Sequence, residues 1–183
     1  MQGKPATSTR QAIHAAAGAL FRQQGYAKTT VRQIAAAAGS DPALVIRHFK
    51  SKELLFLETM ELSIDDEPLL DVPLEHLGER LIDLVIGFDG GARGVFLALV
   101  HGSNEPEIRK RLTGTHEQVF IEPLRRRLSG PDADIRARLA ASVAAGLLYS
   151  LWIARDETLL AADRATLVTR YGELIQHILT PTA

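Results

Sequence analysis

Apolar side chains recur at helical spacing near the start of the chain. Between Ser8 and Gln24 they occupy positions i, i+3, i+4, i+7 and i+8, as Ile13, Ala16, Ala17, Leu20 and Phe21. This spacing places them on one face of an amphipathic helix. Gly25 follows directly and predicts the end of that helix, because glycine readily takes the left-handed conformation at a helix C-terminus.

Two short helices joined by a glycine turn are predicted next. Thr29 or Thr30 can cap the first of them, whose apolar face consists of Val31, Ile34, Ala35 and Ala38. Gly39 breaks this helix. Asp41 followed by Pro42 is a typical start for the second helix, which we expect to end near residue 49.

The rest of the chain keeps a helical pattern and shows no convincing strand alternation. Ser51 caps a fourth helix, and the acidic, proline-containing stretch at 65–73 predicts a linker or a kink after it. A glycine-rich stretch at 87–94 predicts a turn. Further helices are expected over 74–88, 93–101, 105–128 with a break near Gly114 and Pro123, 132–153 and 163–179. The predicted architecture is therefore all-α.

Composition narrows the class of protein. A chain of 183 residues with 46% hydrophobic residues can bury a core in one domain or in two small ones. It has no cysteine, which excludes disulfides, thiolate metal sites and a cysteine nucleophile. The longest uncharged run, residues 139–154, has 16 residues and is short of the roughly 18–20 that a membrane span needs. We therefore expect a cytoplasmic protein with no membrane partner.

Charge is unevenly distributed, although the net charge is only −1. Residues 1–50 carry seven Lys or Arg against a single acid, Asp41, which gives a net charge of +6. The remaining residues carry 14 basic and 21 acidic side chains, which gives −7. A basic N-terminal segment on an acidic body indicates a polyanionic partner.

The two short helices and their glycine turn have the form of a helix-turn-helix, in which the second helix enters the major groove of DNA. Residues 41–49 would form a rod about 13 Å long, close to the groove width of about 12 Å. Caps, turn and core positions recur together in this segment, as Ala15-Ala16, Leu20-Phe21, Gly25-Tyr26, Thr29-Thr30-Val31, Ile34-Ala35, Ala38-Gly39, Val45, His48-Phe49 and Ser51-Lys52-Glu53. With these residues the sequence over 8–60 resembles the TetR family of transcriptional regulators, and the segment 41–45 resembles a variant common in actinobacteria.

The resemblance implies a DNA-binding surface on these helices. Thr30 and Arg32 would meet phosphates or a groove edge, and Lys52 would meet a phosphate. The groove-facing residues would be Pro42, Ala43, Ile46, Arg47 and His48. Ile46 stands where many members carry a tyrosine, so it offers apolar contact, for example to a thymine methyl, and no hydrogen bond. Arg47 on a lone helix would be a solvated charge, but within this set of residues we favour a DNA contact.

The resemblance also implies a C-terminal body that binds a small effector and pairs with a second subunit. The expected organisation is an N-terminal three-helix helix-turn-helix DNA-binding domain, residues 1–60 with the motif at about 30–49, and a C-terminal helical ligand-binding and dimerisation domain, residues 61–183. The homodimer would form through the helices at about 132–153 and 163–179. Taken singly, each candidate ligand-binding residue is better interpreted as ordinary core. If a cavity exists, the candidates are Phe88, Phe96, His101, Phe120, Tyr149 and Trp152, with His101 and Tyr149 as the polar, orienting pair.

Motifs for catalysis are missing from the sequence. The histidines show no HExxH or other metal spacing, and the glycine-rich stretch lacks the Lys-Ser/Thr of a phosphate loop. We therefore expect no enzyme, no catalytic residue, no metal and no cofactor. The sequence predicts a ligand-responsive transcriptional regulator, a repressor that leaves a palindromic operator in double-stranded DNA when a small-molecule effector binds. The alternative is a helical ligand-binding or protein-interaction module whose basic head binds another acidic partner.

Overall fold

The computed structural model describes residues 8–60 and 72–181. Every regular element within these two ranges is helical, which confirms the predicted all-α fold. The described residues divide into two compact units, one drawn from 1–62 and 89–109 and the other from 63–88 and 110–183. Residues 89–109 return to the N-terminal helices and belong to the first unit.

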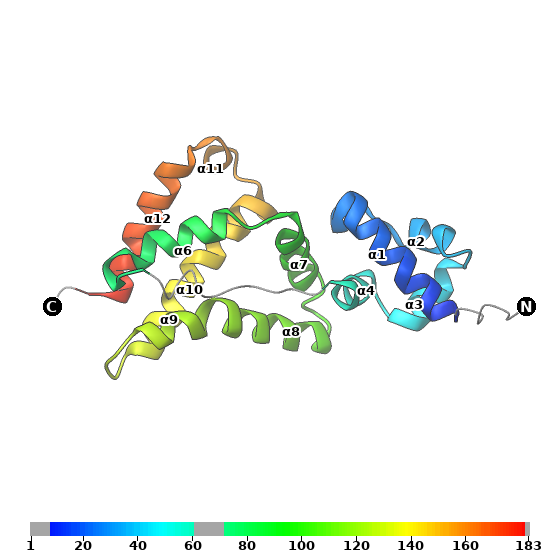
Figure 1. The fold of residues 1–183 in the computed structure, drawn as a ribbon, viewed down its shortest axis with the longest axis horizontal. Coiled ribbons are helices and arrows are strands. Elements are labelled where there is room, and N and C mark those ends of the chain that lie inside the picture. Colours follow the sequence, from blue (N-terminus) through cyan, green and yellow to red (C-terminus); the bar gives the residue numbers. More distant parts are fainter. Residues whose placement is uncertain (1–7, 61–71, 182–183) are drawn as a thin grey trace, which may run out of the picture. The chain divides into compact units, whose positions relative to one another are not determined.

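The first unit is a cluster of helices around α1 (Figure 1). Its helices are α1 (Thr9–Lys28), α2 (Val31–Ala37), α3 (Pro42–Phe49), α4 (Lys52–Thr59) and α7 (Gly90–His101). α1 packs against each of the other four and buries Ile13, Ala17 and Phe21, as the apolar spacing predicted. Gly25 interrupts α1 with a non-helical φ of 78°, so the predicted stop is confirmed, although one further turn follows it.

The glycine-rich stretch at 87–94 is a turn only in part. α7 starts inside it at Gly90, because Asp89 caps the helix and accepts a backbone hydrogen bond at 2.9 Å. Gly94 lies where α7 packs against α4, and a Cβ atom there would come within 2.9 Å of the Phe56 ring. The prediction of a turn throughout is wrong because a cap and a close helix crossing outweigh the low helix propensity of glycine.

The second unit contains the remaining helices, two of which have π-helical turns attached. Its elements are η1 (Leu74–His76), α6 (Leu77–Ile86), the π-turn η2 (Glu117–Ile121), α9 (Glu122–Arg127), α10 (Ala133–Tyr149), the π-turn η3 (Ser150–Ala154), α11 (Glu157–Ala161) and α12 (Arg164–Leu179). α8 (Pro106–His116) passes from the first unit into the second.

The predicted break near Gly114 and Pro123 takes a different form. α8 continues through Gly114, and the chain then forms η2 before Pro123, which occupies the first turn of α9. Proline has no N–H with which to complete an α-helical hydrogen bond, and a π-turn is one way to accommodate it. The sequence pattern also missed α11, which Asp156 caps with a backbone hydrogen bond at 3.0 Å.

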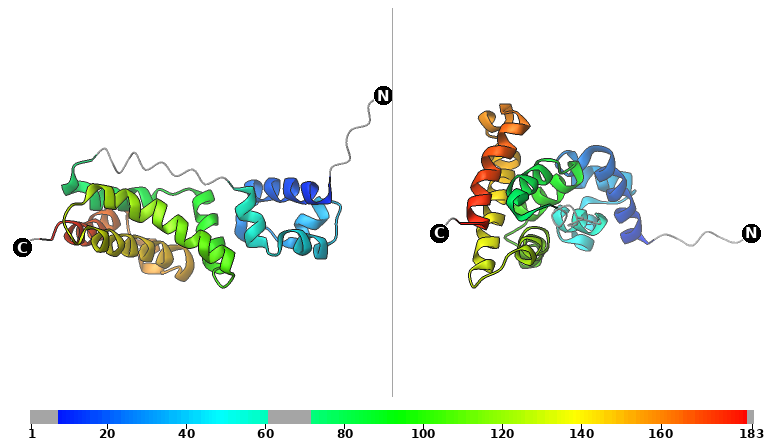
Figure 2. Two further views of the ribbon diagram at one scale, coloured as in Figure 1. Left: turned by 90° about the horizontal axis from the view of Figure 1, so that it is seen from below. Right: turned by 60° about the vertical axis from the view of Figure 1, so that its left-hand side comes forward.

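α6 and α12 cross at very close range (Figures 1 and 2). A Cβ atom on Gly78 of α6 would lie 2.3 Å from the carbonyl oxygen of Gly172 of α12. Gln176 fastens this end, because its side chain accepts from the Gly78 amide at 3.0 Å and donates to a carbonyl of η1 at 3.0 Å. Near the other end Arg164 donates to the Asp83 carboxylate at 2.8 Å. The two helices are therefore held together along their length.

α10 has two apolar faces. One is buried against α6, α9 and α12 and consists of Ala137, Ala140, Ala141, Ala144, Leu147 and Leu148. The opposite face exposes Ile135, Leu139 and Tyr149. By length and composition alone the segment Ala133–Ala154 would suffice to cross a membrane. Its buried face is packed as that of a core helix, and its exposed face remains to be explained.

Candidate nucleic-acid interface

α2 and α3 form the predicted helix-turn-helix. Thr30 caps α2, because its hydroxyl accepts from the Gln33 amide at 3.2 Å while the Gln33 side chain accepts from the Thr30 amide at 2.8 Å. The turn passes through Gly39 with a φ of 60°. Asp41 then caps α3 and accepts from the Ala43 amide at 2.7 Å. The caps and the turn predicted from the sequence are therefore the ones that fix where the two helices begin and how they are joined.

One face of α3 anchors the helix and the other is exposed. Val45 and Phe49 are buried where α3 packs against α1, α2 and α4. Ala43, Ile46 and Arg47 are exposed, and Ile46 shows 44% of its surface to solvent. Because the buried pair fixes the rotation of α3, these three side chains form a surface that a DNA groove could meet.

The other predicted contacts on the motif lie at its edges. Pro42 occupies the first position of α3 and is half-buried, whereas His48 is exposed with its ring 6.4 Å from that of Phe49. Arg32 is exposed in the first turn of α2. Thr30 is exposed as well, although its hydroxyl is engaged in the cap.

Lys52 directs its ammonium group into the protein. It donates to the carbonyl oxygens of Tyr26 and Thr29, both at 3.2 Å, and lies 4.0 Å from the centre of the Tyr26 ring. Burial lowers the pKa of Lys52, and the neighbouring Glu53 opposes this effect. Two of the three ammonium N–H groups therefore hold the last turn of α1 and the start of the loop to α2. A phosphate contact stays a prediction, for which the third N–H group is available.

Tyr26, Lys52 and Glu53 make up a clamp between α1 and α4 that the sequence analysis missed. The Tyr26 hydroxyl donates to the Glu53 carboxylate at 2.5 Å. Burial, reinforced by this hydrogen bond and the charge of Glu53, raises the pKa of Tyr26. Gln24 adds a hydrogen bond at 3.2 Å to the hydroxyl of Thr29 in the same loop. The clamp residues belong to two motifs that carry the family resemblance, but a single sequence does not show that these motifs touch.

Two basic residues of the N-terminal segment are engaged with acids. Arg10 pairs with Glu58 at 2.7 Å, and its guanidinium lies 4.7 Å from the centre of the Phe49 ring. Lys50 ends α3 with a left-handed φ of 65° and lies 3.5 Å from Glu107 in an exposed pair. Exposed ion pairs are weak, so Lys50 remains open to other anions, whereas Arg10 is also held by its ring contact.

The six candidate ligand-binding residues are divided between the two units. Phe96 and His101 belong to the first unit, where His101 is exposed. The other four, in the second unit, are Phe88, Phe120, Tyr149 and Trp152. Tyr149 is 52% exposed on the outer face of α10. The expected orienting pair, His101 and Tyr149, therefore consists of two exposed residues from different units.

Phe88 and Phe120 do come together in the second unit. Their ring centres lie 6.5 Å apart, and the ring of His116, which was not a candidate, lies 5.7 Å from that of Phe120. Burial lowers the pKa of His116; Glu117 opposes this shift and Arg138 adds to it. We refer to Phe88, His116 and Phe120 as the aromatic cluster. It includes η2, and π-turns are frequent at functional sites.

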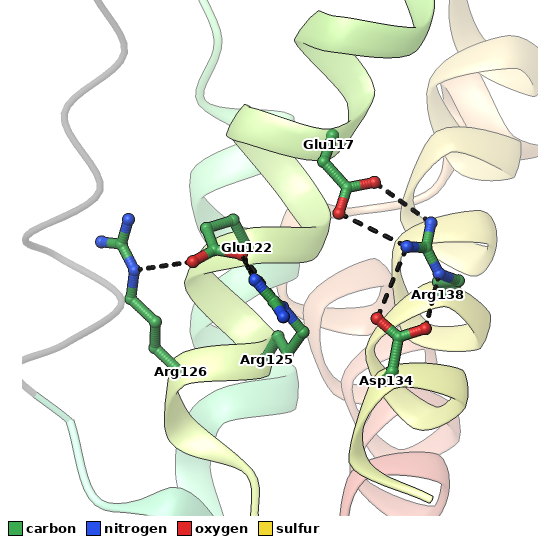
Figure 3. A network of polar contacts seen from close by, with 6 residues as sticks. All are labelled: Glu117, Glu122, Arg125, Arg126, Asp134 and Arg138. Carbon is green, nitrogen blue, oxygen red and sulfur yellow. Dashed lines mark hydrogen bonds and ion pairs between the residues drawn. The ribbon is translucent and has the colours of Figure 1, made fainter.

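A charged network links η2 to α10 (Figure 3). Arg138 of α10 bonds to Glu117 of η2 at 3.1 Å and to Asp134 of its own helix at 2.9 Å. One turn further along, Glu122 pairs with Arg125. These side chains are exposed or partly exposed, so each pair contributes little stability. Across residues 8–60 and 72–181, no group of three or more His, Asp or Glu side chains is arranged to hold a metal ion.

Two stretches of the chain match families of known proteins. Residues 13–59 match a family model described as bacterial regulatory proteins, tetR family, and residues 75–179 match one described as tetracyclin repressor-like, C-terminal domain. A protein of Mycobacterium tuberculosis named HTH-type transcriptional repressor Rv3405c is 28% identical over 169 residues, which cover 81% of this chain and 80% of the relative.

Solved structures give the same likeness over almost the whole chain. NalD, described as the secondary repressor of the MexAB-OprM multidrug efflux pump in Pseudomonas aeruginosa, is 25% identical, with a TM-score of 0.55 over 96% of this chain and 97% of that one. SmeT, solved in complex with triclosan, is 22% identical, with a TM-score of 0.51 over 93% and 89% of the two chains.

Proposed function

The chain belongs to the TetR family of bacterial transcriptional regulators, and we propose that it acts in the cytoplasm as a homodimeric repressor that a small-molecule effector releases from a palindromic operator. The observation that carries this proposal is the two-faced α3, anchored by Val45 and Phe49 and exposing Ala43, Ile46 and Arg47. A helix of this length, about 12 Å, fits a major groove about 12 Å wide.

The residues around α3 supply the remaining DNA contacts in this proposal. Pro42, Ala43, Ile46, Arg47 and His48 face the groove, and Arg47 is the side chain suited to hydrogen-bond a guanine edge. Thr30, Arg32 and Lys52 lie along the phosphates, where cations supply most of the salt-dependent affinity. The clamp supports this arrangement, because it holds the loop that leads into α2.

The exposed apolar faces of α10 and α12 support a homodimer. Ile135, Leu139 and Tyr149 lie on one side of α10, and Leu174 of α12 is 58% exposed beside the half-buried Tyr171. α10 and α12 pack against each other, so a second copy could cover both helices in a four-helix interface. A two-fold dimer is also what a palindromic operator requires.

Effector binding belongs, in this proposal, to the second unit. The aromatic cluster offers apolar rings together with a half-buried imidazole, the mixture typical of small-molecule sites. Release of DNA requires that the effector bind the DNA-incompetent arrangement more tightly, typically by a coupling of about 1–3 kcal/mol. NalD and SmeT, as repressor and ligand complex, support this type of regulation.

Selection of DNA by the full-length protein tests the proposal. Purified protein is incubated with sheared genomic DNA, and the bound fragments are sequenced; we expect an inverted repeat. Arg47→Ala should weaken binding to that repeat, whereas Arg93→Ala, an exposed arginine of α7, serves as the matched control. If each head neutralises about five phosphates, log K should fall against log salt with a slope of roughly −9 per dimer. A folded protein that enriches no repeat at low salt would refute the proposal.

The dimer interface has its own test. Leu174→Glu places a charge on the exposed apolar face of α12 and should convert the dimer to a monomer in analytical ultracentrifugation, with loss of operator binding. Thr169→Glu, on an exposed position of the same helix away from that face, is the control and should remain dimeric. An undisturbed Leu174→Glu dimer would exclude this face.

A further inference from the structure

Ile46 has an unusual position among the surface residues of the first unit. Six large apolar side chains are exposed in the described part of the chain, and Ile46 is the one that belongs to the first unit. The other five lie in the second unit, where Ile135, Leu139 and Tyr149 share the α10 face proposed for the dimer. Ile46 therefore lies outside the face that is proposed for the dimer.

The position of Ile46 on α3 indicates which partner this is. Val45 and Phe49 are buried and fix the rotation of the helix. Ala43 and Ile46, three positions apart, are neighbours on its exposed side, with Arg47 next to them. The exposed side of α3 thus presents apolar methyl groups beside a single guanidinium, within the motif that the proposed function places in the major groove.

Thymine is the standard base that presents an apolar group in the major groove, its C5 methyl. We infer that Ile46 selects the operator by contacting a thymine methyl in each half-site. This inference rests on the proposed function and deepens it by naming the base that α3 requires. A contact of one methyl group corresponds to about fourfold in affinity, and therefore to about 16-fold for a symmetric pair of half-sites that contribute independently.

Replacement of thymine by uracil tests the contact, because it removes the methyl group and leaves base pairing intact. The probe is the duplex that the full-length wild-type protein enriches from a random-sequence pool. Each symmetric pair of thymines is replaced in turn by deoxyuridine, and the dissociation constant is measured at fixed salt. For the wild type one pair should weaken binding by about 16-fold. Ile46→Ala should bind the thymine and uracil duplexes equally, whereas Arg47→Ala should bind both less tightly and keep their ratio.

The outcomes separate this inference from the proposed function. A wild type indifferent to every uracil pair, or an Ile46→Ala protein that keeps the thymine preference, overturns the role of Ile46 and leaves the proposed function standing. A folded wild type that enriches no duplex overturns both. Because the thymine-to-uracil ratio is taken within each variant, a general loss of stability in Ile46→Ala cannot imitate the expected result.

Discussion

Replacing Gly172 by alanine tests the close crossing of α6 and α12. A Cβ atom at this position would lie 2.8 Å from the Cα atom of Glu79 and 2.9 Å from its backbone nitrogen. Both are backbone atoms and cannot rotate away, so the helices must separate to admit the methyl group. Gly114 of α8 is the matched control, because a Cβ atom there meets no described atom within 4 Å.

Two opposing effects set the sign of the change in stability. Alanine is favoured over glycine in a helix interior by about 1 kcal/mol at either position. Overpacking costs about 1–3 kcal/mol, and the upper part of that range applies at Gly172 because its neighbours are backbone. Gly114→Ala should therefore raise the free energy of unfolding by up to about 1 kcal/mol. Gly172→Ala should lower it by about 1–2 kcal/mol.

The chain carries a convenient probe for this measurement. Trp152 is its single tryptophan and belongs to the second unit, which also contains α6 and α12. Its fluorescence during urea unfolding therefore follows the unit in which the crossing lies. All variants are compared at one protein concentration, because the proposed dimer would make the apparent stability depend on concentration. A Gly172→Ala protein as stable as Gly114→Ala would refute the reasoning, since the crossing would then have room for a methyl group.

Three further predictions concern single side chains. Asp41→Asn keeps the cap of α3 and removes a negative charge. Its free energy of unfolding should stay within about 0.5 kcal/mol of the wild-type value, while its affinity for the operator at low salt should rise. Asp41→Ala removes the cap and should lower the free energy of unfolding in urea by about 1 kcal/mol. Burial lowers the pKa of His116, so the neutral imidazole contributes its full stabilisation above the ordinary pKa of about 6.5, and this stabilisation is lost as the pH falls below that value. His116→Gln should lessen the loss of stability at low pH, as measured by unfolding at a series of pH values. Burial raises the pKa of Tyr26, so the neutral phenol contributes its full stabilisation below about pH 10, and this stabilisation is lost above it. Tyr26→Phe should lessen the loss of stability at high pH. If the dependence of stability on pH is the same in the His116 or Tyr26 variant as in the wild type, that residue does not cause the loss.

The helix-turn-helix could be predicted from the sequence because its signals are local. Thr30, Asp41 and Ser51 cap helices through atoms two or three residues away, and Gly39 takes a positive φ that the sequence anticipates. The direction of a long-range contact has no such signal. The inward turn of Lys52, for example, depends on carbonyl oxygens more than twenty positions earlier.

The ligand-binding candidates likewise depend on contacts that the sequence does not signal. α10 is apolar on nearly every side, so its periodicity does not distinguish the face that packs inside the unit from the face that is exposed. Tyr149 and Leu148 are adjacent on that helix, yet one is 52% exposed and the other 1%. In the proposed homodimer a second copy covers the exposed face, and the sequence pattern of such a face does not differ from that of a core face.

The chain connection at Phe88 suggests how the two proposed activities are joined. Phe88 belongs to the aromatic cluster of the second unit, and the next residue, Asp89, caps α7 of the first unit. α7 packs against α1 and α4, the helices that the clamp ties together. A molecule that moves the Phe88 ring therefore acts one peptide bond away from the cap of α7. Because packed cores shift between discrete arrangements, a displacement of Phe88 would reach the packing of α7 against α1 and α4 through the Asp89 cap.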